Sequence, residues 1–262
     1  MYLYPENSKL HSPMIFDTHA HYDDGKFSGL TETLMEDMLK NGVAGIITCG
    51  CDKHSSEAAV ALSHKYDFVY SAVGIHPENL QNGTDLSFIN ELSKDNKCVA
   101  IGETGLDYYW ESDNRALQLD VFEKQLILAN ELSLPIIVHD RDAHMDTLAL
   151  LKKHRPKGVV HCFSGSAEMA KEILKLGMYI GIGGVVTFKN SKKLPNLIRD
   201  LPFDRILLET DAPYLAPEPV RGSICHSGLI TYTAQKVADI KQIPLEEILK
   251  ITNRNAKTLF NL

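Results

Sequence analysis

The chain has 262 residues, of which 44% are hydrophobic and 23% are charged, and its 27 basic and 34 acidic residues give a formal net charge of −7. This composition is typical of a globular protein with a large core, and the acidic balance argues against a broad basic surface that grips duplex nucleic acid. No apolar run reaches the ~18 residues of a membrane-spanning helix, and residues 1–13 lack the basic and apolar parts of a signal peptide.

The cysteine pattern indicates a reducing compartment. The chain has five cysteines, an odd number, and none of them forms a CxxC pair. This pattern favours reduced thiols over a disulfide framework. We therefore expect a cytoplasmic protein that needs neither a membrane nor an obligate protein partner.

Short β-branched runs alternate along the chain with longer amphipathic segments. Eight runs are predicted as strands: 14–21, 45–50, 69–76, 98–107, 135–141, 158–164, 179–185 and 206–211. Helical spacing of apolar residues is clearest at 30–41, 114–132 and 167–176. Eight strands alternating with helices fit a TIM (β/α)₈ barrel of the α/β class better than an open sheet. We expect a single domain over residues 14–262, in which two or three closing helices follow residue 229.

Polar residues fall at or near the ends of the predicted strands. They are His19, His21, His76, Glu103, His139, His161, Glu209 and Asp211. The carboxyl ends of the strands in a parallel barrel share one rim, and that rim carries the chemistry. Apolar strands would not otherwise carry so many polar groups, because burying them unpaired is costly. We therefore expect these side chains to converge.

His19 and His21 are two residues apart on a predicted strand, so their side chains point the same way. Two adjacent imidazoles suit Zn²⁺, Mn²⁺ or Ni²⁺ better than a dry core. The alternative is a buried pair bonded to backbone carbonyls, but the further histidines and carboxylates at the same rim favour metal ligation. Asp17 lies on the same face and is expected to orient one of the imidazoles.

Several segments resemble the TatD family of metal-dependent deoxyribonucleases: FDTHAHYD, AVGIHPE, IGETGLDYYW, PIIVHDRDAH, HCFSGS, LLETDAPYLAPE and the closing NRNAKTLFNL. The matches run in order from residue 14 to residue 262. The resemblance implies a TIM barrel of the wider amidohydrolase-like group. It also implies hydrolysis of phosphodiesters with divalent metals, usually by a DNase with exonuclease character on single-stranded DNA.

The resemblance further implies a site for two divalent ions, which could be Zn²⁺, Mn²⁺, Mg²⁺ or Ni²⁺. The first ion would be bound by His19, His21 and Asp211. The second ion would be bound by His139 and His161, and the carboxylate of Glu103 would bridge both ions. Six donor groups exceed the three or four protein ligands of one catalytic ion, and a carboxylate can span two ions. The ions would polarise phosphoryl oxygens and lower the pKa of a water, whose proton Asp211 would accept.

The remaining polar residues support further expectations. His76 is expected to contact the scissile phosphate or order a water, and its alternative is to cap a backbone carbonyl. Arg141 would grip a phosphate oxygen, or form a salt bridge with an acidic neighbour such as Glu209 or Asp107. Glu209 is otherwise expected to support a ligand from behind, with direct ligation as its alternative. Tyr108 and the two aromatics after it would stack on unpaired bases or pack within their loop.

Two segments depart from the family pattern. Residues 223–228 replace the usual basic residue, asparagine and proline, so Cys225 or His226 would alter substrate contacts there. The histidines outside the site, His226 among them, are otherwise expected at the surface. Residues 1–13 precede the family's usual start and are predicted to be a variable extension.

The leading hypothesis is a phosphodiesterase that acts on DNA ends or single-stranded DNA. The alternative is an amidohydrolase or esterase that uses the same metal site on a C–N or ester bond. A non-catalytic phosphate- or nucleic-acid-binding protein with structural metals is disfavoured, because structural metal sites are closed.

Overall fold

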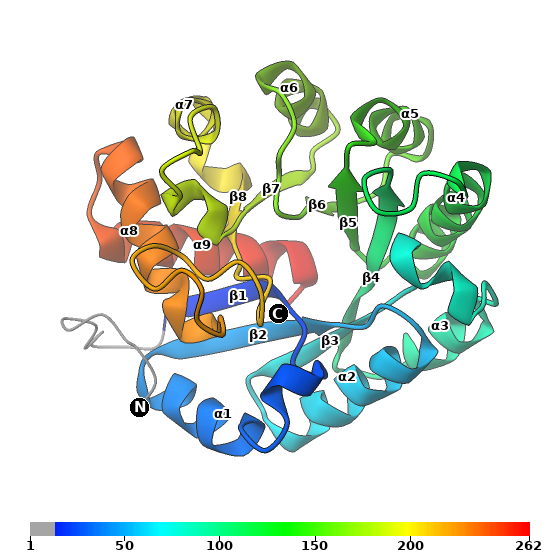
Figure 1. The fold of residues 1–262 in the computed structure, drawn as a ribbon, viewed down its shortest axis with the longest axis horizontal. Coiled ribbons are helices and arrows are strands. Elements are labelled where there is room, and N and C mark those ends of the chain that lie inside the picture. The colour runs from blue at the N-terminus through cyan, green and yellow to red at the C-terminus, as the bar shows by residue number, and fades with distance from the viewer. Residues whose placement is uncertain (1–13) are drawn as a thin grey trace.

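Eight parallel strands pair in chain order, from β1 to β8, in the computed structural model, which describes residues 14–262. The strands are β1 (Ile15–Ala20), β2 (Val43–Cys49), β3 (Val69–Val73), β4 (Cys98–Asp107), β5 (Ile136–Arg141), β6 (Gly158–Val160), β7 (Tyr179–Ile182) and β8 (Ile206–Leu208). The predicted TIM barrel is confirmed (Figure 1). The predicted extension, residues 1–13, lies outside the described residues.

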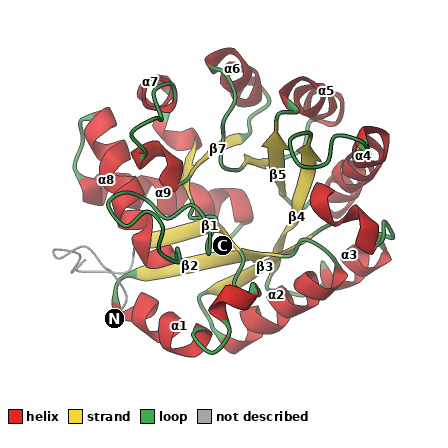
Figure 2. Ribbon diagram, viewed as in Figure 1, coloured by secondary structure: helices red, strands yellow, loops and turns green. Residues whose placement is uncertain are grey.

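Helices surround the strands, as the ring of red ribbons around the yellow arrows in Figure 2 shows. They are α1 (Thr31–Lys40), α2 (Lys53–Lys65), α3 (Ser87–Leu92), α4 (Arg115–Leu132), α5 (His144–His154), α6 (Ala167–Lys175), α7 (Leu194–Asp200), α8 (Ile230–Lys241) and α9 (Leu245–Phe260). The predicted closing helices are α8 and α9. Within residues 14–262, no helix has the length and apolar character needed to cross a membrane.

The barrel interior contains an apolar layer. Ile137, Val159 and Leu207, on three different strands, belong to one buried cluster together with Ala256 and Phe260 of α9. Helix α9 therefore packs against the inner residues that precede the rim. Because strand side chains alternate between faces, the next inward positions come two residues later. They are His139, His161 and Glu209, so the polar groups form the layer above the apolar one.

Several strands end earlier than predicted. β3, β6 and β8 stop at Val73, Val160 and Leu208, so His76, His161 and Asp211 lie one to three residues beyond their strands. Asp211 has a left-handed φ of 60°, which aspartate tolerates better than most residues and which a strand cannot contain. The site residues therefore lie on the turns that leave the rim as well as on the strands.

The seam between β8 and β1 is held by Asp17. The two edges share an isolated bridge between Ala20 and Ala212. The fully buried Asp17 carboxylate accepts hydrogen bonds from Thr210 N at 3.0 Å, from Thr210 Oγ1 at 2.6 Å and from His19 N at 3.2 Å. Burial raises the pKa of the Asp17 carboxyl to about 7, against the opposing effect of the Thr210 hydroxyl. The expectation that Asp17 orients an imidazole is wrong, because its oxygens bind the backbone and a hydroxyl.

Replacing this carboxylate should weaken the barrel. Asp17→Ala removes three hydrogen bonds and leaves buried N–H groups of His19 and Thr210 without their acceptor. We expect a loss of about 3 kcal/mol in the free energy of unfolding, measured by urea denaturation. The control is Asp239→Ala, an exposed aspartate of α8, which should change stability by less than about 0.5 kcal/mol. Equal losses in both variants would contradict the role of Asp17 at the seam.

Candidate metal centre

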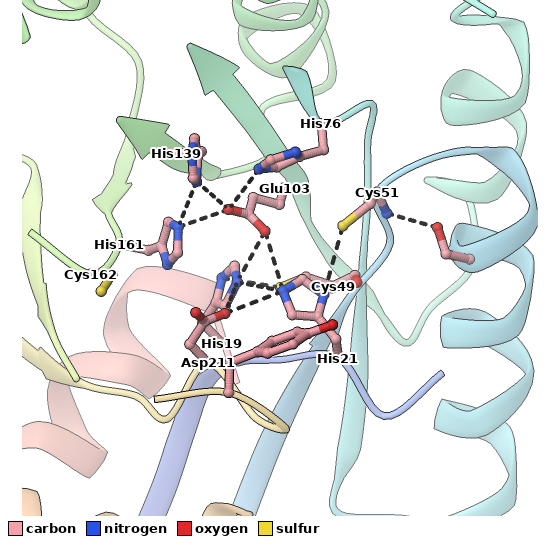
Figure 3. A network of polar contacts seen from close by, with 12 residues as sticks. His19, His21, Cys49, Cys51, His76, Glu103, His139, His161, Cys162 and Asp211 are labelled. Atoms are coloured by element: carbon pink, nitrogen blue, oxygen red, sulfur yellow. Dashed lines mark hydrogen bonds and ion pairs between the residues drawn. The ribbon is translucent and has the colours of Figure 1, made fainter. Parts of the chain in front are cut away.

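The carboxylate of Glu103 lies in the middle of a cluster of imidazoles at the rim (Figure 3). Its Oε2 lies 3.2 Å from His19 Nε2 and 3.3 Å from His21 Nε2. Asp211 Oδ1 joins this group at 3.6 Å from His19 Nε2 and 3.4 Å from His21 Nε2. The two imidazole nitrogens are themselves only 3.1 Å apart. One oxygen of Glu103 therefore faces two histidines and an aspartate.

The other oxygen of Glu103 faces a different group. Oε1 lies 2.7 Å from His161 Nε2 and 2.9 Å from His139 Nδ1. Those two nitrogens are 3.3 Å apart, and His76 Nε2 lies 3.4 Å from the same oxygen. The six residues predicted as ligands thus meet in one place, and Glu103 stands between two halves of the cluster.

Burial and charge oppose each other at this cluster. Glu103 is only 3% exposed, and burial alone would raise its pKa. The imidazoles of His161, His19 and His76 outweigh burial and hold the pKa of Glu103 well below its usual range. Burial likewise lowers the pKa of His139, but hydrogen bonds to Asp107 and Glu103 raise it to about 9. Without metal, protons on imidazoles with a raised pKa, such as that of His139, therefore provide the positive charge of the cluster.

The donor set fits divalent metal ions. Groups of three donors lie within 4.8 Å of one another, among them His19 with His21 and Asp211, and His19 with Glu103 and His161. Imidazole nitrogens and carboxylate oxygens are ligands that Zn²⁺, Mn²⁺ and Ni²⁺ share. A cation would also replace the protons that the buried Glu103 carboxylate needs as its counter-charge.

Carboxylates hold the far side of two of these rings. His139 Nε2 lies 3.0 Å from Asp107 Oδ2, which leaves Nδ1 to face Glu103. His161 Nδ1 lies 3.6 Å from Glu209 Oε1, in keeping with the expectation that Glu209 supports a ligand from behind. A hydrogen bond such as that between Asp107 and His139 fixes which nitrogen faces a metal and how the ring is turned, whereas Glu209 lies beyond hydrogen-bond distance of His161.

Sequence reasoning missed Asp107 as a partner of His139. Its signal was its spacing, because it comes four residues after Glu103 and strand side chains at even spacing share a face. Two thiols were also missed. Cys49 Sγ lies 3.5 Å from His19 Nδ1, and Cys51 Sγ lies 3.7 Å from His21 Nδ1 (Figure 3).

Comparison with known proteins identifies the family. The family model described as TatD related DNase matches residues 16–261. The chain belongs to this family. It is 42% identical to an uncharacterized metal-dependent hydrolase, YabD of Bacillus subtilis, over 95% of this chain and all of that protein. It is 33% identical to a second such hydrolase, YcfH of Escherichia coli, over 95% of this chain and 96% of that protein.

A solved structure agrees with this assignment. The crystal structure of YjjV, a TatD homologue from Escherichia coli, superposes with a TM-score of 0.90 at 32% identity, covering 95% of this chain and 99% of that one. The predicted TatD resemblance is thus confirmed, and the protein is a metal-dependent hydrolase of the TatD family.

His76 points into this TatD site with a defined tautomer. Its Nδ1 accepts a hydrogen bond from Glu78 N at 3.2 Å, so the neutral ring carries its proton on Nε2, which faces Glu103. Burial lowers the pKa of His76 to about 4, against the opposing charge of Glu103. The expected alternative, a cap on a backbone carbonyl, is wrong, because the ring caps an N–H at the start of a short 3₁₀ helix.

The expected substrate contacts are only partly in place. Arg141 forms no ion pair with Glu209, Asp107 or any other described carboxylate, and its guanidinium instead lies over exposed aromatic rings. Tyr108 is engaged by two neighbouring helices, because its hydroxyl donates to Asp146 Oδ2 of α5 at 2.7 Å and Arg115 of α4 lies over its ring.

The atypical segment 223–228 does not offer the expected contacts. Cys225 is fully buried and His226 is 3% exposed, so neither side chain is open to a substrate. The expectations that they contact substrate, or that His226 lies at the surface, are wrong. Cys225 belongs to the apolar core cluster, and burial lowers the pKa of His226 to about 4, features that sequence spacing does not reveal.

Protons and metal should compete for the centre. Because the pKa of His139 is raised to about 9, and that of His161 is raised as well, a metal must displace protons at neutral pH. We expect the metal affinity of chelator-stripped protein to rise between pH 6 and pH 8, by about tenfold per pH unit for each displaced proton. Competition with a chromophoric chelator measures it.

Two variants control this measurement. Glu103→Gln removes the charge that raises the imidazole pKa values, so it should bind metal more weakly and with a flatter pH dependence. Glu111→Gln, a half-buried residue beyond β4, should behave as the unchanged protein does. An affinity that is independent of pH would contradict the competition.

Proposed function

We propose that the protein hydrolyses phosphodiester bonds at DNA ends or in single-stranded DNA with two divalent metal ions. The observation that carries the proposal is the position of Glu103, whose two oxygens face two separate groups of donors. Carboxylates that bridge two ions ~3.5–4 Å apart are typical of phosphatases and nucleases. The description of the matching family as a DNase also supports hydrolysis of phosphodiester bonds.

Asp211 is the proposed proton acceptor. Bound ions would polarise a phosphoryl oxygen and lower the pKa of an attacking water. The Asp211 side chain is 19% exposed, whereas the side chain of Glu103 is 4% exposed. Asp211 can therefore bind at the centre through one oxygen and still pass a proton to solvent. Glu103 is enclosed by imidazoles and is suited to holding the centre together.

His76 is the proposed donor to the substrate. Its Nε2–H lies on the side of the centre that contains His139 and His161. A neutral imidazole with a fixed donor can bond to a phosphoryl oxygen that gains charge in the transition state. Its backbone anchor at Glu78 keeps the ring from turning away.

The acidic balance of the chain is compatible with a DNA substrate. An enzyme that takes one end of a strand needs few phosphate contacts, and bound divalent ions supply positive charge at the site itself.

All five thiols are free, which supports the proposed cytoplasmic location.

The substrate class can be tested directly. We expect the protein with Mg²⁺ or Mn²⁺ to release nucleotides from a single-stranded oligonucleotide, to act poorly on a long blunt duplex, and to lose activity reversibly with a chelator. Acyl esters and amides form the second arm of the assay. Hydrolysis of these compounds without any cleavage of DNA would overturn the proposal in favour of the amidohydrolase or esterase alternative.

The proposed role of Asp211 has a matched control on the same rim. Asp211→Asn should lower kcat/KM by about a hundredfold or more, since a general base contributes roughly 10²–10⁴. Asp142→Asn is the control, because Asp142 is exposed after β5 and shares a left-handed backbone, with φ of 55° against 60°. It should retain activity within about twofold. Full activity in Asp211→Asn would show that another group accepts the proton.

A further inference from the structure

Two aromatic side chains project from the rim directly after β4. Tyr109 is 55% exposed and Trp110 is 60% exposed, and their rings meet edge to face with centroids 4.7 Å apart. Neighbouring exposed aromatics are more informative than single scattered apolar residues, because adjoining apolar surface is a feature of binding sites. The pair therefore needs an explanation beyond packing.

Arg141 extends this surface. Its guanidinium lies 4.4 Å from the centroid of the Tyr109 ring and 5.5 Å from that of Trp110. Arg141 is exposed and forms no ion pair with a described residue, so its charge is available to a ligand. Cation–π contact keeps the guanidinium plane next to the rings. The three side chains, Tyr109, Trp110 and Arg141, form a small exposed surface of two perpendicular rings and one guanidinium, which we term the aromatic platform.

One buried carboxylate fixes the platform relative to the metal centre. Asp107 Oδ1 accepts hydrogen bonds from Tyr109 N at 2.9 Å and from Trp110 N at 2.8 Å. Its other oxygen, Oδ2, lies 3.0 Å from His139 Nε2. The same aspartate thus holds a proposed metal ligand and the backbone of both aromatics. The platform is anchored beside the half of the centre that contains His139.

We propose that the aromatic platform is a stacking site for an unpaired nucleobase of the strand whose phosphodiester is bound at the centre. This inference rests on the proposed function. Every nucleobase has a π-face that stacks on aromatic rings and on guanidinium planes. In a duplex those faces are covered by neighbouring bases, so the platform favours an unpaired end.

The charges around the platform favour a base over a phosphate. Glu111 and Asp113 follow Trp110 in the chain. Asp113 is exposed, and its carboxylate repels a phosphate backbone but not a neutral base. Arg141 is then suited to stacking on the base, in place of the phosphate grip expected from the sequence.

Trp110 is the only tryptophan of the chain and therefore reports its own contacts. The test uses protein loaded with Mg²⁺ and a short single-stranded oligonucleotide whose phosphorothioate linkages resist cleavage. We expect tryptophan fluorescence to be quenched on binding. An oligonucleotide of the same length that lacks its bases should bind at least about tenfold more weakly and should not quench the fluorescence.

Variants extend the test to catalysis. Tyr109→Ala and Trp110→Ala should raise KM for a single-stranded oligonucleotide about tenfold and leave kcat nearly unchanged, since stacking binds ground and transition states alike. Phe203→Ala is the matched control: Phe203 is 38% exposed with Lys241 over its ring, but it precedes β8 at the opposite end of the barrel. It should leave KM unchanged.

The outcomes separate this inference from the proposed function. Cleavage of DNA with unchanged KM in both variants and no base-dependent quenching would overturn the platform and leave the phosphodiesterase standing. Base-dependent quenching without cleavage of any oligonucleotide would support the platform and overturn the phosphodiesterase.

Discussion

The buried charge of Glu103 determines how the rim is built. Five imidazole nitrogens, from His19, His21, His76, His139 and His161, lie within 3.4 Å of its carboxylate oxygens. An ionised carboxylate in such a place is tolerated only with compensating positive charge. Protons on imidazoles whose pKa values are raised, among them His139 and His161, supply that charge in the metal-free protein, and divalent ions would supply it in the proposed enzyme. The same electrostatic demand thus explains the low pKa of Glu103 and the clustering of histidines from separate strands.

Other acidic groups keep the imidazoles in position. Asp107 and Glu209 contact the outer nitrogens of His139 and His161, and Asp17 holds the backbone of His19 against β8. Glu209 fits because residue 181 is glycine: a Cβ there would lie 2.5 Å from Glu209 Oε2. These carboxylates contact the predicted metal ligands or their backbone, but they are not among the six ligands themselves. A change in Asp107 would alter metal binding through the orientation of the His139 ring, and a change in Asp17 would alter it through the backbone position of His19, even with all six ligands intact.

Strand periodicity made much of this arrangement predictable. Alternation along each strand, together with the common direction of parallel strands, places His139, His161 and Glu209 on one inner layer, and the chain carries these residues at the corresponding positions. The predictions that failed concern contacts that a side chain makes with other elements of the fold. The burial of Cys225 depends on how α8 packs, and the contacts of Arg141 depend on where the loop after β4 turns. Neither is encoded in a period of two or 3.6 residues.

The metal centre and the aromatic platform contribute differently to substrate recognition. A pair of cations held by Glu103 would stabilise charge on an acyl oxygen as well as on a phosphoryl oxygen, so the centre alone does not select the bond. Selection must come from groups that touch the rest of the substrate. Tyr109, Trp110 and Arg141 are such groups, because they are exposed and yet fixed to the centre through Asp107. A substrate with a planar group beside its scissile bond would contact the metal centre and the aromatic platform at once. A simple acyl ester would contact only the metal centre.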